Sequence, residues 1–276
     1  MRGRHPIVVP GVYDALGARM VQSVGFGAMF QTGYGTSATL LGMPDYGFVG
    51  AAETVDNARR ICSAVSVPVI VDADTGYGGA LNVHHLVRQL EEAGAGGIFL
   101  EDQRWPKRCG HMEGKEVLPQ GEYAEKLGAA LDARQSRDFV VVARTDARAT
   151  EGLDAAIQRG QDNYRTGADA IFVEAPRTIE EMRHIGKAIN APLVANMIEG
   201  GATPIQPAES LHSMGFTLVL YPLSVLYASA AAALSTLKDL RRNGTTTNPS
   251  MLSFEQFNEL VGLPGVRSLA ERLASK

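Results

Sequence analysis

Two aspartates, Asp72 and Asp74, stand two positions apart in the segment VDADTGYG, directly after a short apolar run. On a continuing strand the side chains at positions i and i+2 point the same way, so these two carboxylates would repel each other. A divalent cation would remove the repulsion, and Glu101 at the end of the next apolar run can add a third oxygen ligand. Such oxygen sets suit Mg²⁺ or Mn²⁺. The aspartate pair alone is equally typical of a loop-stabilising role, but together with Glu101 it favours a metal site.

A second segment rich in chemistry, EDQRWPKRCGHMEGK, covers residues 101–115. Its length, glycines and charges are typical of a mobile loop that covers an active site. Two cations precede Cys109 and His111 follows it, and we expect these neighbours to lower the pKa of the thiol. A solvated basic loop with an incidental thiol is the alternative. Cys62, on the inner face of an amphipathic segment, is expected to lie in the core.

Eight short apolar runs, alternating with helix-length segments, must position these residues. The runs are continuous and too short for helices, which is typical of parallel strands covered on both faces. Eight βα repeats over about 240 residues predict a (β/α)8 TIM-type barrel rather than a doubly wound sheet. The predicted strands are Pro6–Pro10, Ala28–Gln31, Pro68–Asp72, Gly96–Glu101, Asp138–Arg144, Ala170–Glu174, Ala191–Asn196 and Phe216–Tyr221. Predicted helices include Ala51–Ala64, Asn82–Ala93, Gly121–Gln135, Leu153–Thr166 and Thr178–Ala188.

Polar side chains follow most of these predicted strands, where the catalytic residues of such barrels lie. Polar residues also begin ordinary loops, which would explain one or two of them. Many charged groups converging on one pocket would be costly without a ligand, so the pattern favours an active site. The residues at the strand exits are Tyr13 and Asp14, Thr32, Asp72 and Asp74, Glu101 and Asp102, Arg144 and Asp146, Glu174, Asn196 and Tyr221.

Composition excludes several other classes of protein. The chain has 276 residues, 45% of them hydrophobic, and a net charge of −4 without a basic block, so we expect no nucleic-acid partner. No run approaches the roughly 20 apolar residues that span a bilayer, and we expect no membrane partner and a cytoplasmic location. The two cysteines are too few for a disulfide framework.

Taken together, these motifs resemble the isocitrate lyase and phosphoenolpyruvate mutase superfamily. The element KRCGH at residues 107–111 is specific to its lyase branch, and the likeness runs over nearly the whole chain. The resemblance implies a Mg²⁺-dependent barrel enzyme that cleaves C–C bonds or rearranges P–C bonds next to a carboxylate. It also implies a tetramer, in many members with the eighth helix exchanged between subunits. Further matching segments are VPGVYDA (9–15), GMPD (42–45), ARTDA (143–147) and ANM (195–197).

The resemblance also implies a metal site with four carboxylates. Asp72 and Asp74 would hold the Mg²⁺, or Mn²⁺, directly or through water. Asp45 and Glu101 would lie in its outer shell. A 2-oxo acid bound to the metal would have its developing negative charge stabilised where that charge appears.

The same resemblance implies the remaining roles. Residues 32–34 match the loop whose backbone N–H groups bind the 2-oxo or 2-hydroxy acid end, and Arg144 pairs with the substrate. Cys109 resembles the general acid that protonates the carbanion of the departing half. The candidate catalytic residues are therefore Cys109, Arg144, His111 and Tyr13, and the candidate substrate-binding residues are Thr32, Gly33, Tyr34, Gly110, Glu174 and Asn196.

One departure from the family pattern concerns the substrate. Methylisocitrate lyases carry a motif resembling ANITEFG at the seventh strand, whereas residues 195–201 here read ANMIEGG. Ile198 replaces a hydroxyl, and a site that leaves a substrate carboxylate unpaired discriminates against it. Within the range from methylisocitrate to 2-alkylmalates, we expect a smaller or more alkylated malate such as 2,3-dimethylmalate, cleaved to a 2-oxo acid such as pyruvate and a carboxylic acid.

Three other functions are open at this point. A phosphonomutase, of the carboxyphosphonoenolpyruvate or phosphoenolpyruvate type, can carry the same KRCGH element. An oxaloacetate hydrolase or decarboxylase could use the same Mg²⁺ platform. A catalytically silent barrel is expected to have lost Asp72 or Asp74, and both are present.

The C-terminal part of the chain differs in character from the barrel. We divide the chain into a catalytic barrel, residues 1–243, and a helical tail, residues 244–276. Ser224–Leu240 reads as an Ala-rich helix, and the tail carries further apolar residues such as Phe254 and Phe257. The tail either folds back on its own barrel or packs with the eighth helix across a subunit boundary. We favour the second arrangement, in a homotetramer built as a dimer of dimers.

Overall fold

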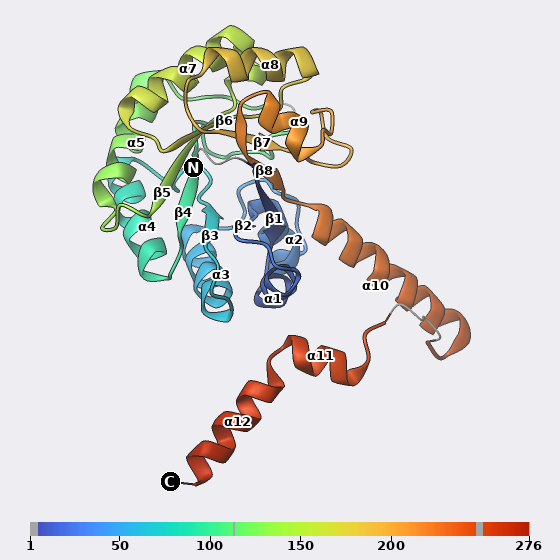
Figure 1. Cartoon of the computed structure of the whole chain (residues 1–276). Coiled ribbons are helices and arrows are strands. Elements are labelled where there is room, and N and C mark those ends of the chain that lie inside the picture. The colour runs from blue at the N-terminus through green and yellow to red at the C-terminus, as the bar shows by residue number, and fades with distance from the viewer. Residues whose placement is uncertain (1–4, 113, 247–250, 276) are drawn as a thin grey trace.

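Eight parallel strands close into a barrel in the computed structural model, which describes residues 5–112, 114–246 and 251–275 (Figure 1). Each strand pairs with the next one along the chain, and the first pairs with the last, with Ile7 opposite Leu218. The (β/α)8 prediction is therefore confirmed. The strands are β1 (Ile7–Val12), β2 (Met29–Gln31), β3 (Val69–Asp72), β4 (Gly97–Glu101), β5 (Val140–Thr145), β6 (Ala170–Val173), β7 (Leu193–Asn196) and β8 (Phe216–Tyr221).

Helices follow the strands and form the outer layer. Ala51–Ala64 and Leu153–Thr166 match their predicted bounds, the predicted helix Ser224–Leu240 extends three residues further, and the other predicted helices shift by one or two residues at their ends. The helices are α1 (Ala15–Val24), α2 (Gly33–Leu41), α3 (Ala51–Ala64), α4 (Ala80–Glu92), α5 (Gln120–Ala133), α6 (Ala147–Thr150), α7 (Leu153–Thr166), α8 (Ile179–Ala188), α9 (Ala208–Ser213), α10 (Ser224–Asn243), α11 (Phe254–Leu260) and α12 (Leu263–Ala274).

The core has two layers because every strand is buried on both faces. The larger layer lies between strands and helices and contains Cys62 at its partly buried margin, as expected. The smaller layer fills the barrel interior, where Phe99 stacks between Phe30 at 4.9 Å and Phe172 at 5.7 Å, measured between ring centroids. A barrel interior packed in this way is a solid floor and not a channel. The strand ends above it can therefore carry a site.

Not every polar residue at a strand exit belongs to that site. Asp14 caps α1 by accepting a hydrogen bond from the Gly17 backbone N–H at 2.6 Å. Thr32 caps α2 in the same manner, through the Gly35 N–H at 3.4 Å. Side-chain oxygens at such positions satisfy backbone N–H groups that have no partner in the helix. Helix capping therefore explains the polar residue Asp14 at the end of β1, and no ligand is needed to account for it.

The last helices leave the barrel. In Figure 1, α10 projects from the barrel wall, followed by α11 and α12, and none of these helices contains a buried residue. Their apolar side chains are exposed, including Leu234 at 56% and Leu237 at 60%. Among the described residues, no helix is long and apolar enough to span a bilayer. The cytoplasmic location stays a prediction.

Candidate active site

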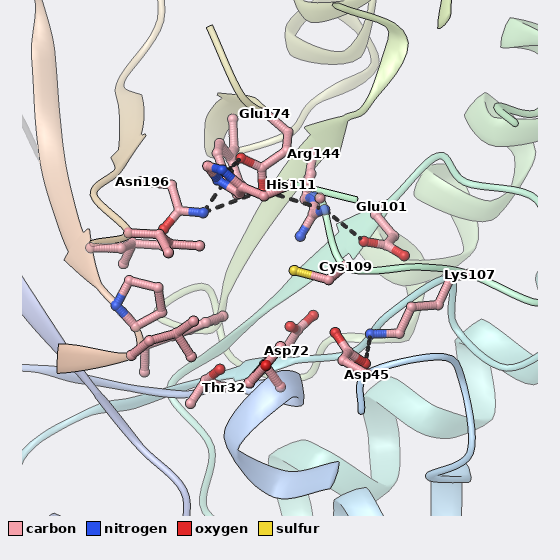
Figure 2. Close-up of a pocket in the computed structure, with 18 of the residues that line it drawn as sticks. Thr32, Asp45, Asp72, Glu101, Lys107, Cys109, His111, Arg144, Glu174 and Asn196 are labelled. Carbon is pink, nitrogen blue, oxygen red and sulfur yellow. Dashed lines mark hydrogen bonds and ion pairs between the residues drawn. The ribbon is translucent and has the colours of Figure 1, made fainter. Parts of the chain in front are cut away.

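A small cavity of about 40 Å³ lies at the carboxyl ends of the strands. The loop of residues 102–119 between β4 and α5 covers it, so residues distant in the sequence face one another (Figure 2). The lining residues are Phe30, Thr32, Tyr34, Asp45, Asp72, Glu101, Lys107, Arg108, Cys109, Gly110, His111, Arg144, Phe172, Glu174, Asn196, Ile198, Leu220, Pro222 and Leu223.

Most of the candidates from the sequence lie on this wall, and three do not. Asp74 lies just behind the wall, where its carboxylate contacts Lys107. Gly33 lies behind Asp72. Tyr13 is 7% exposed, and its backbone carbonyl accepts a hydrogen bond from the Asn57 side chain. The structure therefore does not bring Tyr13 to the pocket.

Asp72, at the end of β3, is held by backbone groups. Its carboxylate accepts the N–H of Gly33 at 3.2 Å and the N–H of Asp74 at 3.3 Å. A Cβ on Gly33 would lie 2.9 Å from Asp72 Oδ2, so a larger residue here would have to displace this carboxylate. The Gly33 N–H, expected to bind substrate, is directed at Asp72. Among the described residues, no cation pairs with Asp72.

Asp45 and Asp74 share the ammonium group of Lys107. Lys107 Nζ lies 2.5 Å from Asp45 Oδ1 and 2.7 Å from Asp74 Oδ1, and its side chain is 3% exposed. Burial, together with the Asp72 and Asp45 carboxylates, raises the pKa of Asp74 to about 7 despite Lys107. Burial alone would lower the pKa of Lys107, but the surrounding carboxylates raise it well above its ordinary value. Lys107 is therefore a cation at neutral pH.

Arg144, at the end of β5, lies among three carboxylates. Its Nη2 is 3.3 Å from Glu101 Oε2 and 3.3 Å from Glu174 Oε2, and its Nε donates to Asp146 Oδ2 at 2.9 Å. Burial would raise the pKa of Glu174, but Arg144 and the neighbouring His111 ring hold it well below its usual range. Burial raises the pKa of Glu101 more than Arg144 lowers it, so its pKa is well above normal.

His111 and Asn196 surround Glu174 from the other side (Figure 2). His111 Nδ1 accepts the Ala202 backbone N–H at 2.8 Å, which assigns the proton of the neutral ring to Nε2. That Nε2 lies 3.3 Å from Glu174 Oε1. Asn196 Nδ2 lies 3.3 Å from Glu174 Oε2, whereas its buried Oδ1 has no partner among the described residues. A substrate hydroxyl could satisfy this oxygen.

Cys109 projects its sulfur into the cavity, between the Arg144 group and Asp72 (Figure 2). Its backbone N–H donates to the Asp45 carbonyl at 3.3 Å. The expectation of a lowered thiol pKa is wrong: burial, with the Asp45 and Glu174 carboxylates, raises it to about 11. Sequence proximity to Lys107 and Arg108 was misleading, because burial destabilises the thiolate more than the His111 backbone N–H and Arg144 stabilise it. At neutral pH the group is a thiol, which can give a proton.

The covering loop is fastened at several points. The side-chain amide of Gln103 donates to the Arg108 carbonyl at 2.8 Å and accepts the Arg108 N–H at 3.0 Å. Lys115 reaches Asp146 at 2.8 Å. Lys107, Lys115 and Asp146 are absent from the sequence-based candidates. No periodicity could have revealed the two lysines, since their partners come from distant parts of the chain, although Asp146 stood at a strand exit.

The donor set fits a hard divalent cation that keeps some of its waters. Within the described residues, no three Asp, Glu, His or Cys side chains converge closely enough to enclose a metal by themselves. Asp72 faces the cavity without a cation, and Glu101 Oε1 is buried without a hydrogen-bond partner. Mg²⁺ usually binds to one or two carboxylates and takes its other ligands from water and substrate. An ion of this kind agrees with an incomplete protein shell.

The β7–β8 side of the cavity is mostly apolar. Asn196 is followed on this side by Ile198, Leu220, Pro222 and Leu223. Ile198 is 8% exposed, so the position that departs from the methylisocitrate lyase motif is part of the wall. The charged and apolar halves of the pocket therefore face a ligand from different directions.

Comparisons with known proteins agree with this site. The family model for phosphoenolpyruvate phosphomutase matches residues 1–241. The chain is 49% identical to "Carboxyvinyl-carboxyphosphonate phosphorylmutase, chloroplastic" of Arabidopsis thaliana, over 98% of this chain and 81% of that protein. It is 42% identical to 2,3-dimethylmalate lyase of Eubacterium barkeri, over 98% of this chain and 94% of that protein.

Solved structures give the same result. An oxaloacetate acetylhydrolase bound to the inhibitor 3,3-difluorooxalacetate superposes with a TM-score of 0.94 at 34% identity, covering 99% of this chain and 93% of that chain. Members of the superfamily use a divalent metal ion. The chain belongs to the phosphoenolpyruvate mutase family and is an enzyme of the superfamily of carbon–carbon lyases and phosphomutases that also includes isocitrate lyase.

Proposed function

We propose that this enzyme is a Mg²⁺-dependent carbon–carbon lyase that cleaves a 2-alkylmalate of the 2,3-dimethylmalate type. The products are a 2-oxo acid such as pyruvate and a short carboxylic acid. The observation that carries the proposal is the half-buried Cys109, which stays a protonated thiol while it faces a pocket of carboxylates and Arg144. A carbanion acid is required for this cleavage and not for a phosphoryl shift.

The reaction divides into a bond cleavage and a proton return. The 2-hydroxyl loses its proton to a carboxylate of the pocket, a carbonyl forms at C2, and the C2–C3 electron pair leaves with the departing half as a carbanion. Cys109 then protonates that carbanion. General acid catalysis of this kind contributes about 10²- to 10⁴-fold in rate. Burial supports this role because it keeps the thiol protonated until the carbanion takes its proton.

The acidic cluster is proposed to hold the metal, Mg²⁺ or Mn²⁺. Asp72 and Asp74 would bind it directly or through water, with Asp45 and Glu101 in the outer shell. The cation-free Asp72 and the unpartnered Glu101 Oε1 support this assignment. A bound Mg²⁺ supplies Lewis acidity at the substrate oxygen that becomes the carbonyl.

The acid end of the substrate is proposed to lie between the start of α2 and Arg144. Thr32 and Tyr34 line the cavity at the N-terminus of this helix, and backbone N–H groups at helix N-termini favour anions. Arg144 pairs with a substrate carboxylate. Glu174 accepts a hydrogen bond from the Asn196 side-chain amide. This contact orients Asn196 for its own hydrogen bond to the substrate.

The apolar wall supports an alkylated substrate. Ile198 and Leu220 offer no hydrogen bond to a further carboxylate, and a buried unpaired carboxylate costs more than a lost contact. Methyl groups of an alkylmalate would instead pack against them. Two other activities have support from the comparisons: a phosphonomutase, from the 49% identical relative, and an oxaloacetate hydrolase, from the solved neighbour.

The eighth helix and the tail are proposed to pack across a subunit boundary in a tetramer. An apolar groove of about 360 Å³ lies outside β1, lined by Val8, Val21, Val24, Phe26 and Tyr221 among others. An eighth barrel helix normally covers such a sector, but α10 projects away and leaves Val24 at 74% exposure. A helix exchanged from a second copy would cover both apolar surfaces.

A substrate screen tests the proposed reaction. The enzyme with Mg²⁺ is incubated with 2,3-dimethylmalate, other 2-alkylmalates, methylisocitrate, oxaloacetate and phosphonopyruvate, and release of 2-oxo acid is followed with lactate dehydrogenase and by NMR. We expect the highest kcat/KM with a 2-alkylmalate. Turnover confined to phosphonopyruvate, or oxalate release from oxaloacetate alone, would assign the chain to one of the two other activities.

Removal of a metal ligand gives a second prediction. Asp72→Ala should abolish turnover and weaken Mn²⁺ binding, followed by electron paramagnetic resonance, because it removes a carboxylate from an accessible cavity. The circular dichroism spectrum should be unchanged. Asp56→Ala, which removes an exposed carboxylate on α3, is the matched control and should bind Mn²⁺ normally. Full activity of Asp72→Ala in EDTA would refute the metal site.

Replacement of the thiol separates lyase from mutase. Cys109→Ser should reduce C–C cleavage by roughly 10²-fold or more, because a serine hydroxyl is a much weaker acid. Cys62→Ser changes the other cysteine, which lies on α3, and should leave kcat near the wild-type value. An unchanged rate in Cys109→Ser would exclude the thiol as the proton donor.

Light scattering tests the assembly. The full chain should have the mass of four 29.4 kDa subunits at micromolar concentration. The double variant Leu234→Glu, Leu237→Glu should shift it to a smaller species, because both side chains are exposed on α10 and would be buried by an exchange. Lys238→Gln on the same helix is the control. A monomer mass for the wild-type chain would contradict the proposal.

A further inference from the structure

We propose that Lys115 is a positioning residue of this site, which fastens the covering loop to the same carboxylate that orients Arg144. Lys115 does not line the active-site cavity. Its role concerns how the pocket is held together. Only the kinetic part of its test rests on the proposed function.

Lys115 is buried in an ion pair that joins two separate parts of the chain. Its side chain is 2% exposed, and Nζ lies 2.8 Å from Asp146 Oδ1, on a carboxylate with no exposed surface. The same ammonium group donates a hydrogen bond to the carbonyl of Gly110. A buried ammonium is costly unless its partners compensate it. Lys115 therefore links its own end of the loop and the Gly110 peptide to the buried carboxylate of Asp146.

A buried network at the base of the covering loop, where the chain leaves β4, keeps Asp146 in place. The Asp146 backbone N–H donates to Asp102 Oδ1 at 2.9 Å, and the Thr145 hydroxyl donates to Asp102 Oδ2 at 2.6 Å. Asp102 has no exposed surface, and Arg159 lies 3.4 Å from it. The network joins Thr145 at the end of β5, Asp102 directly after β4 and Arg159 in α7. Asp146 is thus an anchor on the rigid scaffold, and Lys115 is the partner that the loop supplies.

The anchor also orients Arg144. Arg144 Nε donates to Asp146 Oδ2 at 2.9 Å, and Nη2 donates to Oδ1 at 3.2 Å, the oxygen that Lys115 also contacts. With Lys115 present, two cations share one carboxylate, and more of the Arg144 charge is left for a substrate anion. Without it, the buried cluster of Asp146, Glu101 and Glu174 gains one unit of negative charge. Binding of an anionic substrate would weaken.

The second contact of Lys115 reaches the thiol through the backbone. Gly110 follows Cys109 and packs tightly, since a Cβ there would lie 2.4 Å from Glu174 Oε2 and 2.5 Å from Arg144 Nη2. The Lys115 ammonium holds the Gly110 carbonyl on the other side of this peptide. Loss of the contact would let the peptide move, and a displacement near 1 Å at a reacting group can cost about 10²-fold in rate.

Limited proteolysis tests the proposal without any substrate. Trypsin cleaves after Arg108 only when the loop leaves the pocket. Mass spectrometry measures the peptide that this cleavage releases. Lys115→Met should be cleaved there at least about tenfold faster than the wild type, because cleavage samples the open population. Lys115→Arg keeps a cation and should restore protection. Arg104→Met, which removes an exposed cation of the same loop, is the matched control and should be cleaved after Arg108 at the wild-type rate.

Steady-state kinetics give the second readout. Lys115→Met should raise KM and lower kcat, with a loss in kcat/KM of about 10²-fold, and Lys115→Arg should recover most of it. Cys109→Ser, in contrast, should lower kcat with little change in KM. If the wild-type enzyme cleaves no alkylmalate, the proposed function fails, while the protease result still decides the role of Lys115.

The decisive comparison is between folded variants. Circular dichroism and thermal melting establish the fold, and Lys115→Gln replaces Lys115→Met if the latter does not fold. A wild-type cleavage rate in the folded neutral variant overturns the proposal. Equal loss of protection in Lys115→Arg and Lys115→Met also overturns it, because the cation would then have no role beyond filling space.

Discussion

Neutralisation of buried carboxylates is the constraint on which this site depends. Asp45, Asp74, Glu101, Asp146 and Glu174 all lose water at the mouth of the barrel, and an ionised carboxylate cannot be buried without a partner. Arginine and lysine side chains supply the counter-charges, and Lys107 and Arg144 each contact more than one carboxylate. The opposing pKa shifts follow from the balance at each carboxylate: Arg144, His111 and Lys115 together outweigh burial at Glu174, whereas burial outweighs Arg144 at Glu101.

The covering loop is part of this charge balance. Lys107 and Lys115 come from the loop, whereas the carboxylates that they meet come from strand exits or from the segment before α3. The loop therefore covers the cavity and also supplies cations that neutralise its buried carboxylates. Cys109 faces the same charged pocket, and its burial together with the Asp45 and Glu174 carboxylates keeps the proton on the thiol.

Different parts of the barrel provide its stability and its chemistry. Phe30, Phe99 and Phe172 pack inside the barrel and form a floor on which the polar strand ends stand. Changes in the loops above that floor alter the ligand without altering the barrel, which is the reason this architecture supports many reactions. Ile198 is one such position, because it contributes to the apolar side of the cavity while Asn196, two residues earlier, belongs to the polar side.

The sequence by itself determined the barrel and the set of strand exits, because both depend on local patterns: continuous apolar runs and the residues that end them. It also identified Cys109 and most of the wall through short motifs. Only the tertiary structure decided the partners, since Lys107 meets Asp45 from 62 positions away and Lys115 meets Asp146 across 31. The same reason explains the error about the thiol. Its pKa follows from burial and from carboxylates brought by distant strands, and no neighbour in the sequence reports either of them.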